Sequence, residues 1–210
     1  SDQIIENDSA VNTNQPPQTD TIRSAKSEKV QPKLKSVDTL ESNKLIIKYD
    51  RNSGELLYSE LKDYAVDLGS DEKIIILDYE KKKYSATSNI QLLNTDIYPV
   101  YSKKNSSRIN TVVLESTNIA GVTLTKEITL LDDTHQIAIR NIIKNNSTKS
   151  IDVRNYETIS RDDNNTASIM LPTYTGSAYY DEENKFSKLS FEDIIDNSQT
   201  VKTQSSWISM

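Results

Sequence analysis

Cysteine is absent from this 210-residue chain, and glycine and histidine are scarce. Without cysteine the chain forms no disulfide, offers no thiol nucleophile and has no cysteine-based zinc site. Its four glycines are isolated from one another, whereas the phosphate cradles of dinucleotide-binding and P-loop proteins need closely spaced glycines. No Gly-x-Ser-x-Gly motif is present, so a hydrolase nucleophile elbow is not supported.

Long apolar runs are also missing. No stretch approaches the roughly 18 consecutive apolar residues of a membrane-spanning helix, and no signal peptide is visible. The net charge of -6 makes nucleic acid an improbable partner. Taken by itself, the composition predicts a soluble, acidic protein.

The first 36 residues are rich in Asn, Gln, Ser, Thr and charged residues and contain few large apolar ones. Such a segment cannot bury enough surface to offset its ordering entropy, so residues 1–36 are predicted to be a disordered linker. Five basic residues bias its second half and could attract anionic lipid headgroups; a solvated linker is the interpretation we favour. They are Arg23, Lys26, Lys29, Lys33 and Lys35.

From about Val37 the pattern predicts strand after strand. The apolar run 73–79 is typical of a strand buried on both faces, and the charged residues 80–83 predict a turn. Gly54 closes a turn of residues that tolerate special backbone angles. The expected strands cover residues 45–49, 55–61, 73–79, 84–92, 98–101, 109–115, 122–130, 137–143 and 151–153.

Alternation is clearest at Val122, Leu124, Ile128 and Leu130, with threonines and Glu127 on the opposite face. The neighbouring strands from 121 to 160 predict an antiparallel meander, with a break in alternation at Asn141. About a dozen strands with frequent turns are best buried as two packed sheets. We therefore expect an all-β fold, a large antiparallel β-sandwich, with a short helix near the C-terminus.

Candidate catalytic and metal-binding residues are few. His135 is the single histidine and follows an acidic turn, where a solvated surface residue is the favoured interpretation. Residues 160–165 carry oxygen ligands that could suit Ca²⁺, but their spacing lacks the order of an EF-hand loop. The eleven tyrosines could line a groove for a peptide, glycan or lipid tail, although tyrosine is also an ordinary strand residue. No cofactor, metal site or catalytic residue is expected.

The last fifth of the chain is the most informative. An aromatic strand-like run is followed by a charged turn, and apolar residues at 191, 194 and 195 predict one or two turns of helix. Ser190 and Asp193 have the spacing of a weak capping box. The pattern as a whole is carried by Tyr174, Gly176, Ala178, Tyr179, Lys188, Phe191, Ile194, Trp207 and Met210.

In order and spacing these residues resemble the end of the large periplasmic domain of the YidC membrane protein insertase family, Gram-negative type. The opening strand, the turn at Gly54 and the Leu-x-x-Tyr segment 61–64 are similar to that family as well. Two departures are the serines at 205 and 206, where the family usually has glycines before the tryptophan, and Ser53 before Gly54.

The resemblance implies a super-sandwich fold similar to galactose mutarotase, spanning residues 37–210 and ending in a linker to a membrane part absent from this chain. It implies a non-catalytic periplasmic domain, anchored at the bacterial inner membrane, of an insertase and chaperone. The parent would act on nascent membrane proteins alone or with the Sec translocon, and the nine residues above would couple the sandwich to the membrane core. Alternatives are a free-standing periplasmic carbohydrate-binding or mutarotase-like protein, and a structural β-domain such as an adhesin.

Overall fold

The computed structural model describes residues 36–93, 95, 97–162, 174, 176–183, 185–196 and 207–210. The predicted linker 1–36 lies outside them, apart from its last residue. The strands are β1 (Val37–Glu41), β2 (Leu45–Asp50), β3 (Leu56–Ala65), β4 (Lys73–Asp78), β5 (Ser85–Leu92), β6 (Ser102–Lys104), β7 (Thr111–Ile119), β8 (Val122–Leu130), β9 (Ile137–Asn145), β10 (Val153–Ser160), β11 (Gly176–Asp181), β12 (Lys185–Ser190) and β13 (Trp207–Ser209). The helices are α1 (Tyr79–Lys82) and α2 (Phe191–Asp196).

The described strands form three antiparallel sheets. A six-stranded sheet has the order β1-β2-β3-β5-β10, with β4 also paired to β3. A four-stranded sheet has the order β6-β7-β8-β9, and a small sheet has the order β12-β11-β13. The predicted antiparallel all-β class is therefore confirmed.

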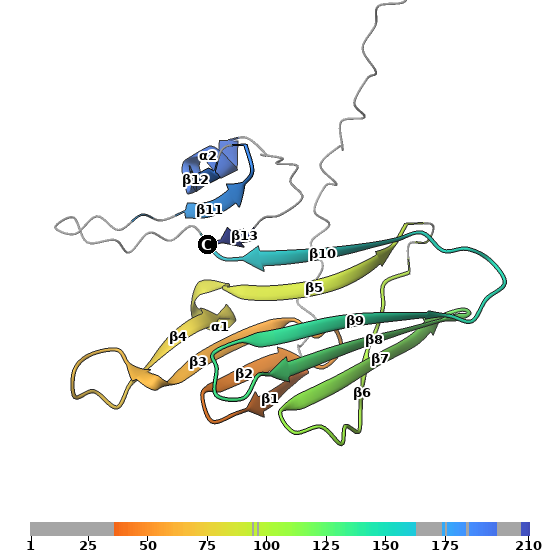
Figure 1. Cartoon of the computed structure of the whole chain (residues 1–210), viewed down its shortest axis with the longest axis horizontal. Helices are drawn as coiled ribbons and strands as arrows, with labels where there is room; N and C mark the ends of the chain where they lie inside the picture. Colours follow the sequence, from red (N-terminus) through yellow and green to blue (C-terminus); the bar gives the residue numbers. More distant parts are fainter. Residues whose placement is uncertain are drawn as a thin grey trace, which may run out of the picture. The chain divides into compact units, whose positions relative to one another are not determined.

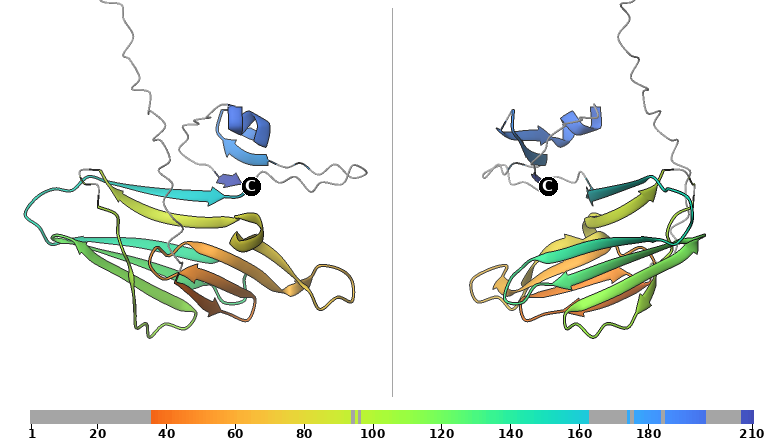
Figure 2. Two further views of the ribbon diagram at one scale, coloured as in Figure 1. Left: turned by 180° about the vertical axis from the view of Figure 1, so that it is seen from behind. Right: turned by 45° about the vertical axis from the view of Figure 1, so that its right-hand side comes forward.

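One hydrophobic core joins the six-stranded and four-stranded sheets (Figure 1). Its fully buried side chains come from β2 on one side and from β7 and β8 on the other, and the further views in Figure 2 show the two layers facing each other. The most deeply buried apolar members are Leu45, Ile47, Tyr49, Leu114, Leu124, Ile128 and Leu130. This is the packing of a β-sandwich.

Two predictions around β4 are wrong. The run 73–79 is not buried on both faces, because Leu77 is its one buried side chain and Ile76 is exposed. The reason is that β4 pairs with β3 and with no other described strand. The charged residues after it form the helix α1 rather than a turn; Asp78 caps this helix by accepting a hydrogen bond from the backbone N–H of Lys81 at 3.1 Å.

The segment 98–101 is not a strand, contrary to the prediction. Its backbone bonds to side chains and loops: the Val100 N–H donates to Asn118 Oδ1, and the Tyr101 N–H donates to the carbonyl of Asn52. The ladder with β7 begins only at Ser102.

The predicted meander ends one strand early. β8 and β9 are antiparallel neighbours as expected, and β9 continues through Asn141, the polar residue that interrupts its apolar alternation. β10, however, pairs along its full length with β5 in the other sheet. β5 meets β3 through a single residue pair, Leu56 and Ala86, and β10 covers the opposite edge of β5.

Candidate functional site

The residues singled out near the C-terminus form a small sheet with α2, here called the C-terminal module (β11, β12, α2 and β13). β11 is its central strand, with β12 on one edge and β13 on the other. Ala178 of β11 pairs with Lys188 of β12 and with Ser209 of β13, so the structure brings these parts of the pattern together. The strands β12 and β13 were not predicted.

Gly176 is required by a close approach. A Cβ at this position would lie 2.3 Å from the carbonyl oxygen of Leu189 and 2.5 Å from the hydroxyl of Tyr174. Tyr174 is held there because its hydroxyl donates to the carbonyl of Ser177 at 2.8 Å and its ring lies 4.7 Å from the ammonium of Lys188. The aromatic-x-Gly pattern is thus explained, because the Tyr174 side chain lies against the start of β11, where a residue larger than glycine would collide with it.

The predicted capping box at α2 is confirmed. The Asp193 N–H donates to Ser190 Oγ at 3.1 Å, and the Ser190 N–H donates to Asp193 Oδ2 at 3.2 Å. Both donors belong to the first turn, where backbone N–H groups have no helical acceptor. The box sets where β12 ends and α2 begins.

At the other edge of the module, Trp207 pairs with Tyr180, and its ring lies 6.0 Å from that of Phe186. Both rings are about half exposed. Ser177 Oγ donates to the carbonyl of Ser209 at 3.1 Å, which adds a side-chain bond to the short β13 ladder.

Among the described residues, four that join the module to the sandwich are here called the clasp (Tyr84, Arg161, Phe191 and Met210). The Tyr84 hydroxyl donates to the carbonyl of Met210 at 2.6 Å. The Arg161 guanidinium lies 5.3 Å from the ring of Tyr84 and 5.1 Å from the ring of Phe191. Cation–π contacts of this kind stabilise by about 0.5–2 kcal/mol, depending on desolvation.

A second unusual feature is a charged side chain in the core. Lys126 is an inward-facing residue of β8 and is 0% exposed. Its ammonium donates to the carbonyl of Ser53 at 2.7 Å and to Asn89 Oδ1 at 2.8 Å, and it lies 5.1 Å from the Tyr101 ring. Burial lowers the pKa of Lys126 from 10.5 to about 8, although nearby Glu157 and Glu55 act in the opposite direction.

Lys126 belongs to a polar row that crosses between the sheets. It pairs with Asn141 of β9, whose Nδ2 donates to Ser88 Oγ at 2.8 Å and to Asn155 Oδ1 at 2.9 Å. Ser88 Oγ in turn donates to Glu157. These bonds tie β8 and β9 to β5 and β10 at specific positions, so the row fixes how the two sheets align.

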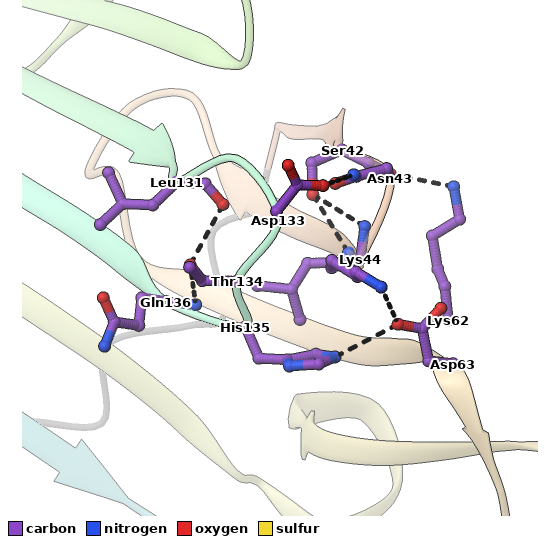
Figure 3. Close-up of polar contacts among 11 residues, drawn as sticks. Ser42, Asn43, Lys44, Lys62, Asp63, Leu131, Asp133, Thr134, His135 and Gln136 are labelled. Atoms are coloured by element: carbon purple, nitrogen blue, oxygen red, sulfur yellow. Dashed lines mark hydrogen bonds and ion pairs between the residues drawn. The ribbon is translucent and has the colours of Figure 1, made fainter.

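His135 lies at the surface, in the turn between β8 and β9 (Figure 3). Its Nε2 is 3.9 Å from Asp63 Oδ2, and its ring is 5.3 Å from that of Tyr64. Asp63 also accepts a bond from Lys44 at 2.6 Å, which lowers the pKa of its carboxyl group. His135 therefore lies beside a carboxylate of β3 and is exposed at the surface, as expected.

The match to known proteins covers this whole arrangement. The family model of the YidC periplasmic domain matches residues 38–210, which include both large sheets, the clasp and the C-terminal module. The chain belongs to the YidC periplasmic domain family.

Relatives of this YidC periplasmic domain are full-length proteins named membrane protein insertase YidC. The chain is 26% identical over 190 residues to the protein of Shewanella woodyi, covering 84% of this chain and 35% of that protein. It is 25% identical over 186 residues to the protein of Haemophilus ducreyi (82% and 34%) and 27% identical over 186 residues to that of Actinobacillus succinogenes (83% and 35%). The chain therefore spans about a third of the length of these relatives.

For this YidC periplasmic domain, sequence reasoning missed Lys126, Tyr84 and Arg161. The sequence did contain a signal for Lys126, because this residue interrupts the apolar face of a strictly alternating strand.

Some of the predicted candidates lie outside the described residues, namely Asp163–Asn165 and the serines at 205 and 206. Within the described ranges, no group of acidic or histidine residues is placed to hold a metal ion. Of the two described helices, neither is long and apolar enough to cross a membrane.

Proposed function

We propose that this chain is the periplasm-facing domain of an inner-membrane protein insertase and that it positions the membrane part without performing chemistry itself. The family match over residues 38–210 carries the proposal, since the similar proteins are named insertases. Such a protein would move apolar segments of nascent membrane proteins into the bilayer, where their backbone groups are satisfied within helices. It would act alone or beside the Sec translocon.

In this proposal the domain has a mechanical role, which two contacts at the C-terminus support. β13 is hydrogen-bonded to β11, and the carbonyl of Met210 accepts a hydrogen bond from Tyr84, the residue just before β5. A membrane part that follows Met210 would therefore be attached to the sandwich through an ordered strand. The nine residues of the C-terminal pattern act in this proposal by building the module that transmits the position of the sandwich.

The test uses the full-length insertase carrying this domain, in cells depleted of their own insertase. Arg161→Gln removes the guanidinium between Tyr84 and Phe191 while keeping a polar side chain of similar length. We expect slower insertion of a single-span reporter protein, measured by protease protection, because the sandwich no longer holds the module in place.

Arg154→Gln is the matched control. It removes the same charge from β10, the strand that ends just before Arg161, at an exposed position that has no ion pair within the described part of the chain. Equal insertion rates for wild type, Arg161→Gln and Arg154→Gln would contradict a positioning role for the clasp.

A second function, periplasmic carbohydrate binding, is favoured by one observation. A cavity of about 220 Å³ lies between β5, β10 and the segment before β6, and Tyr98, Tyr101 and Tyr156 line it together with Asn89. Aromatic faces and amide groups could bind a neutral sugar ring. Calorimetry with a panel of neutral sugars discriminates: saturable heat that Tyr101→Phe abolishes would support a sugar-binding protein, and absence of heat would count against it.

A further inference from the structure

A groove of about 510 Å³ lies between the open side of β4 and the clasp residues Tyr84 and Arg161. Four cationic side chains line it, namely those of Lys73, Lys81, Lys82 and Arg161. None of the four forms an ion pair with another residue in the described ranges, whereas Lys44, Lys62, Lys103 and Lys104 all do. The three lysines of this groove are therefore available to an outside partner, whereas the Arg161 guanidinium also contacts the rings of Tyr84 and Phe191.

The acidic residues of the groove do not cancel this charge. Glu72 and Asp78 also line it, and Asp78 Oδ1 is already engaged in capping α1. The groove thus carries more positive than negative side chains on a chain whose net charge is -6. A local excess of the opposite sign to the whole molecule favours an anionic partner.

The floor and rim of the groove are apolar. Ile74, Ile75 and Ile76 of β4 line it, and Ile76 and Val66 are 48% and 51% exposed. Leu68, at the tip of the connection that precedes β4, is fully exposed. A small soluble anion would make no use of these side chains, whereas a phospholipid offers a phosphate to the lysines and a glycerol and acyl region to the isoleucines.

We propose that this groove docks the domain onto the anionic phospholipids of a membrane surface. The proposal rests on the proposed function, in which a membrane part follows Met210. Tyr84 both lines the groove and holds the carbonyl of Met210. The lipid-binding groove and the strand that would lead to the bilayer therefore share one residue, so docking would fix the domain against the membrane beside its own attachment point.

The test is flotation of the 210-residue chain with vesicles of phosphatidylcholine alone and of phosphatidylcholine mixed with phosphatidylglycerol. We expect binding to the mixed vesicles only, weakening with added salt. Lys81→Gln combined with Lys82→Gln should lower the partition coefficient about thirtyfold, since each basic residue near an anionic surface contributes about a factor of five. Both side chains are exposed, so the fold should persist.

Lys144→Gln combined with Lys149→Gln is the matched control, because it removes the same charge from exposed positions in β9 and in the connection that follows it. The control should bind like wild type. Equal loss in the two double variants would overturn the groove assignment, and so would equal binding to both kinds of vesicle. Inorganic phosphate should displace the chain no better than chloride of the same ionic strength; stronger displacement would identify a small-anion site instead. These outcomes concern vesicle binding alone, so they are separable from the insertion rates that test the proposed function.

Discussion

At the scale of single residues, Lys126 is the least expected feature. A charged ammonium is costly to bury unless hydrogen bonds replace its hydration. Two carbonyl oxygens and the Tyr101 ring do so here. Gly54 makes room for it, since a Cβ there would lie 2.6 Å from Lys126 Cδ. Lys126 and Gly54, which lies in the turn between β2 and β3, therefore form one packing unit.

The pH dependence of stability should report this burial. The pKa of Lys126 is lowered from 10.5 to about 8, so between these values the unfolded chain binds a proton that the folded chain does not. The free energy of unfolding contributed by this group must then rise with pH across that window, by about 3 kcal/mol, and be lowest below pH 8. Urea titrations of wild type and Lys126→Met at several pH values measure it, and the difference between the two chains should grow with pH. A difference that stays constant from pH 7 to 10.5 would show that burial does not lower the pKa of the Lys126 amine.

Gly176 makes a second residue-scale prediction. Gly176→Ala would place a methyl group against the carbonyl of Leu189 and the Tyr174 ring, so the module should lose about 2–3 kcal/mol. Trp207 is the single tryptophan of the chain and lies in β13, so its fluorescence during urea unfolding reports on the module. Gly69→Ala is the control: Gly69 also has a positive φ, of 80° against 158° at Gly176, but a Cβ there meets nothing within 4 Å, so this change should cost about 1 kcal/mol. Equal losses would argue against the close approach.

At the scale of elements, the periodicity of apolar residues predicted the structure of single segments that are continuous in the chain. The alternation of 122–130 became β8 with every second side chain buried, and the capping residues Ser190 and Asp193 set the start of α2. Pairing between distant segments was beyond such reasoning. β10 leaves β9 for β5 because β5 has an open edge, and no pattern within 121–160 encodes that edge.

The candidate site also has parts that the local sequence predicted and contacts between distant segments that it did not. The order of residues 174–210 located the module, because each of its turns and caps is encoded within a few residues. The clasp was not predictable, because Tyr84 is 126 positions from Met210 and ordinary in its own strand. Arg161 likewise gains its role only when β10 brings it beside Tyr84.

The start of α2 offers an element-scale prediction. Ser190→Ala removes the acceptor for the Asp193 N–H and the partner of the Asp193 carboxylate. The module should lose about 0.5–2 kcal/mol, again measured through Trp207 fluorescence in urea. Ser187→Ala, on the preceding strand, is the control and should change stability little. A cap variant as stable as that control would mean that α2 is held by packing alone.

At the scale of the whole molecule, the hydrophobic core and the C-terminal module are distinct. Among the described residues, the core cluster draws its members from the six-stranded and four-stranded sheets and from the loops between them, and includes none from 174 onward. Within the described residues, the contacts that join the module to the sandwich include the hydrogen bond and the cation–π contacts of the clasp. Regions with few buried apolar contacts open at lower free energy than the core.

The chain should therefore unfold in two steps. Trp207 fluorescence, which follows the module, should change at lower urea concentration than the far-UV circular dichroism that follows the two large sheets, because non-coincident transitions mark independently opening parts. Tyr84→Phe removes the hydroxyl that donates to the Met210 carbonyl and should move the fluorescence transition to still lower urea while leaving the circular dichroism transition in place. Tyr64→Phe, which removes a hydroxyl from an exposed tyrosine of β3, is the matched control and should shift neither transition. If the two probes coincide in wild type and in Tyr84→Phe, the module is part of one cooperative unit, and a positioning role would have to act through a rigid body rather than through a clasp that can open.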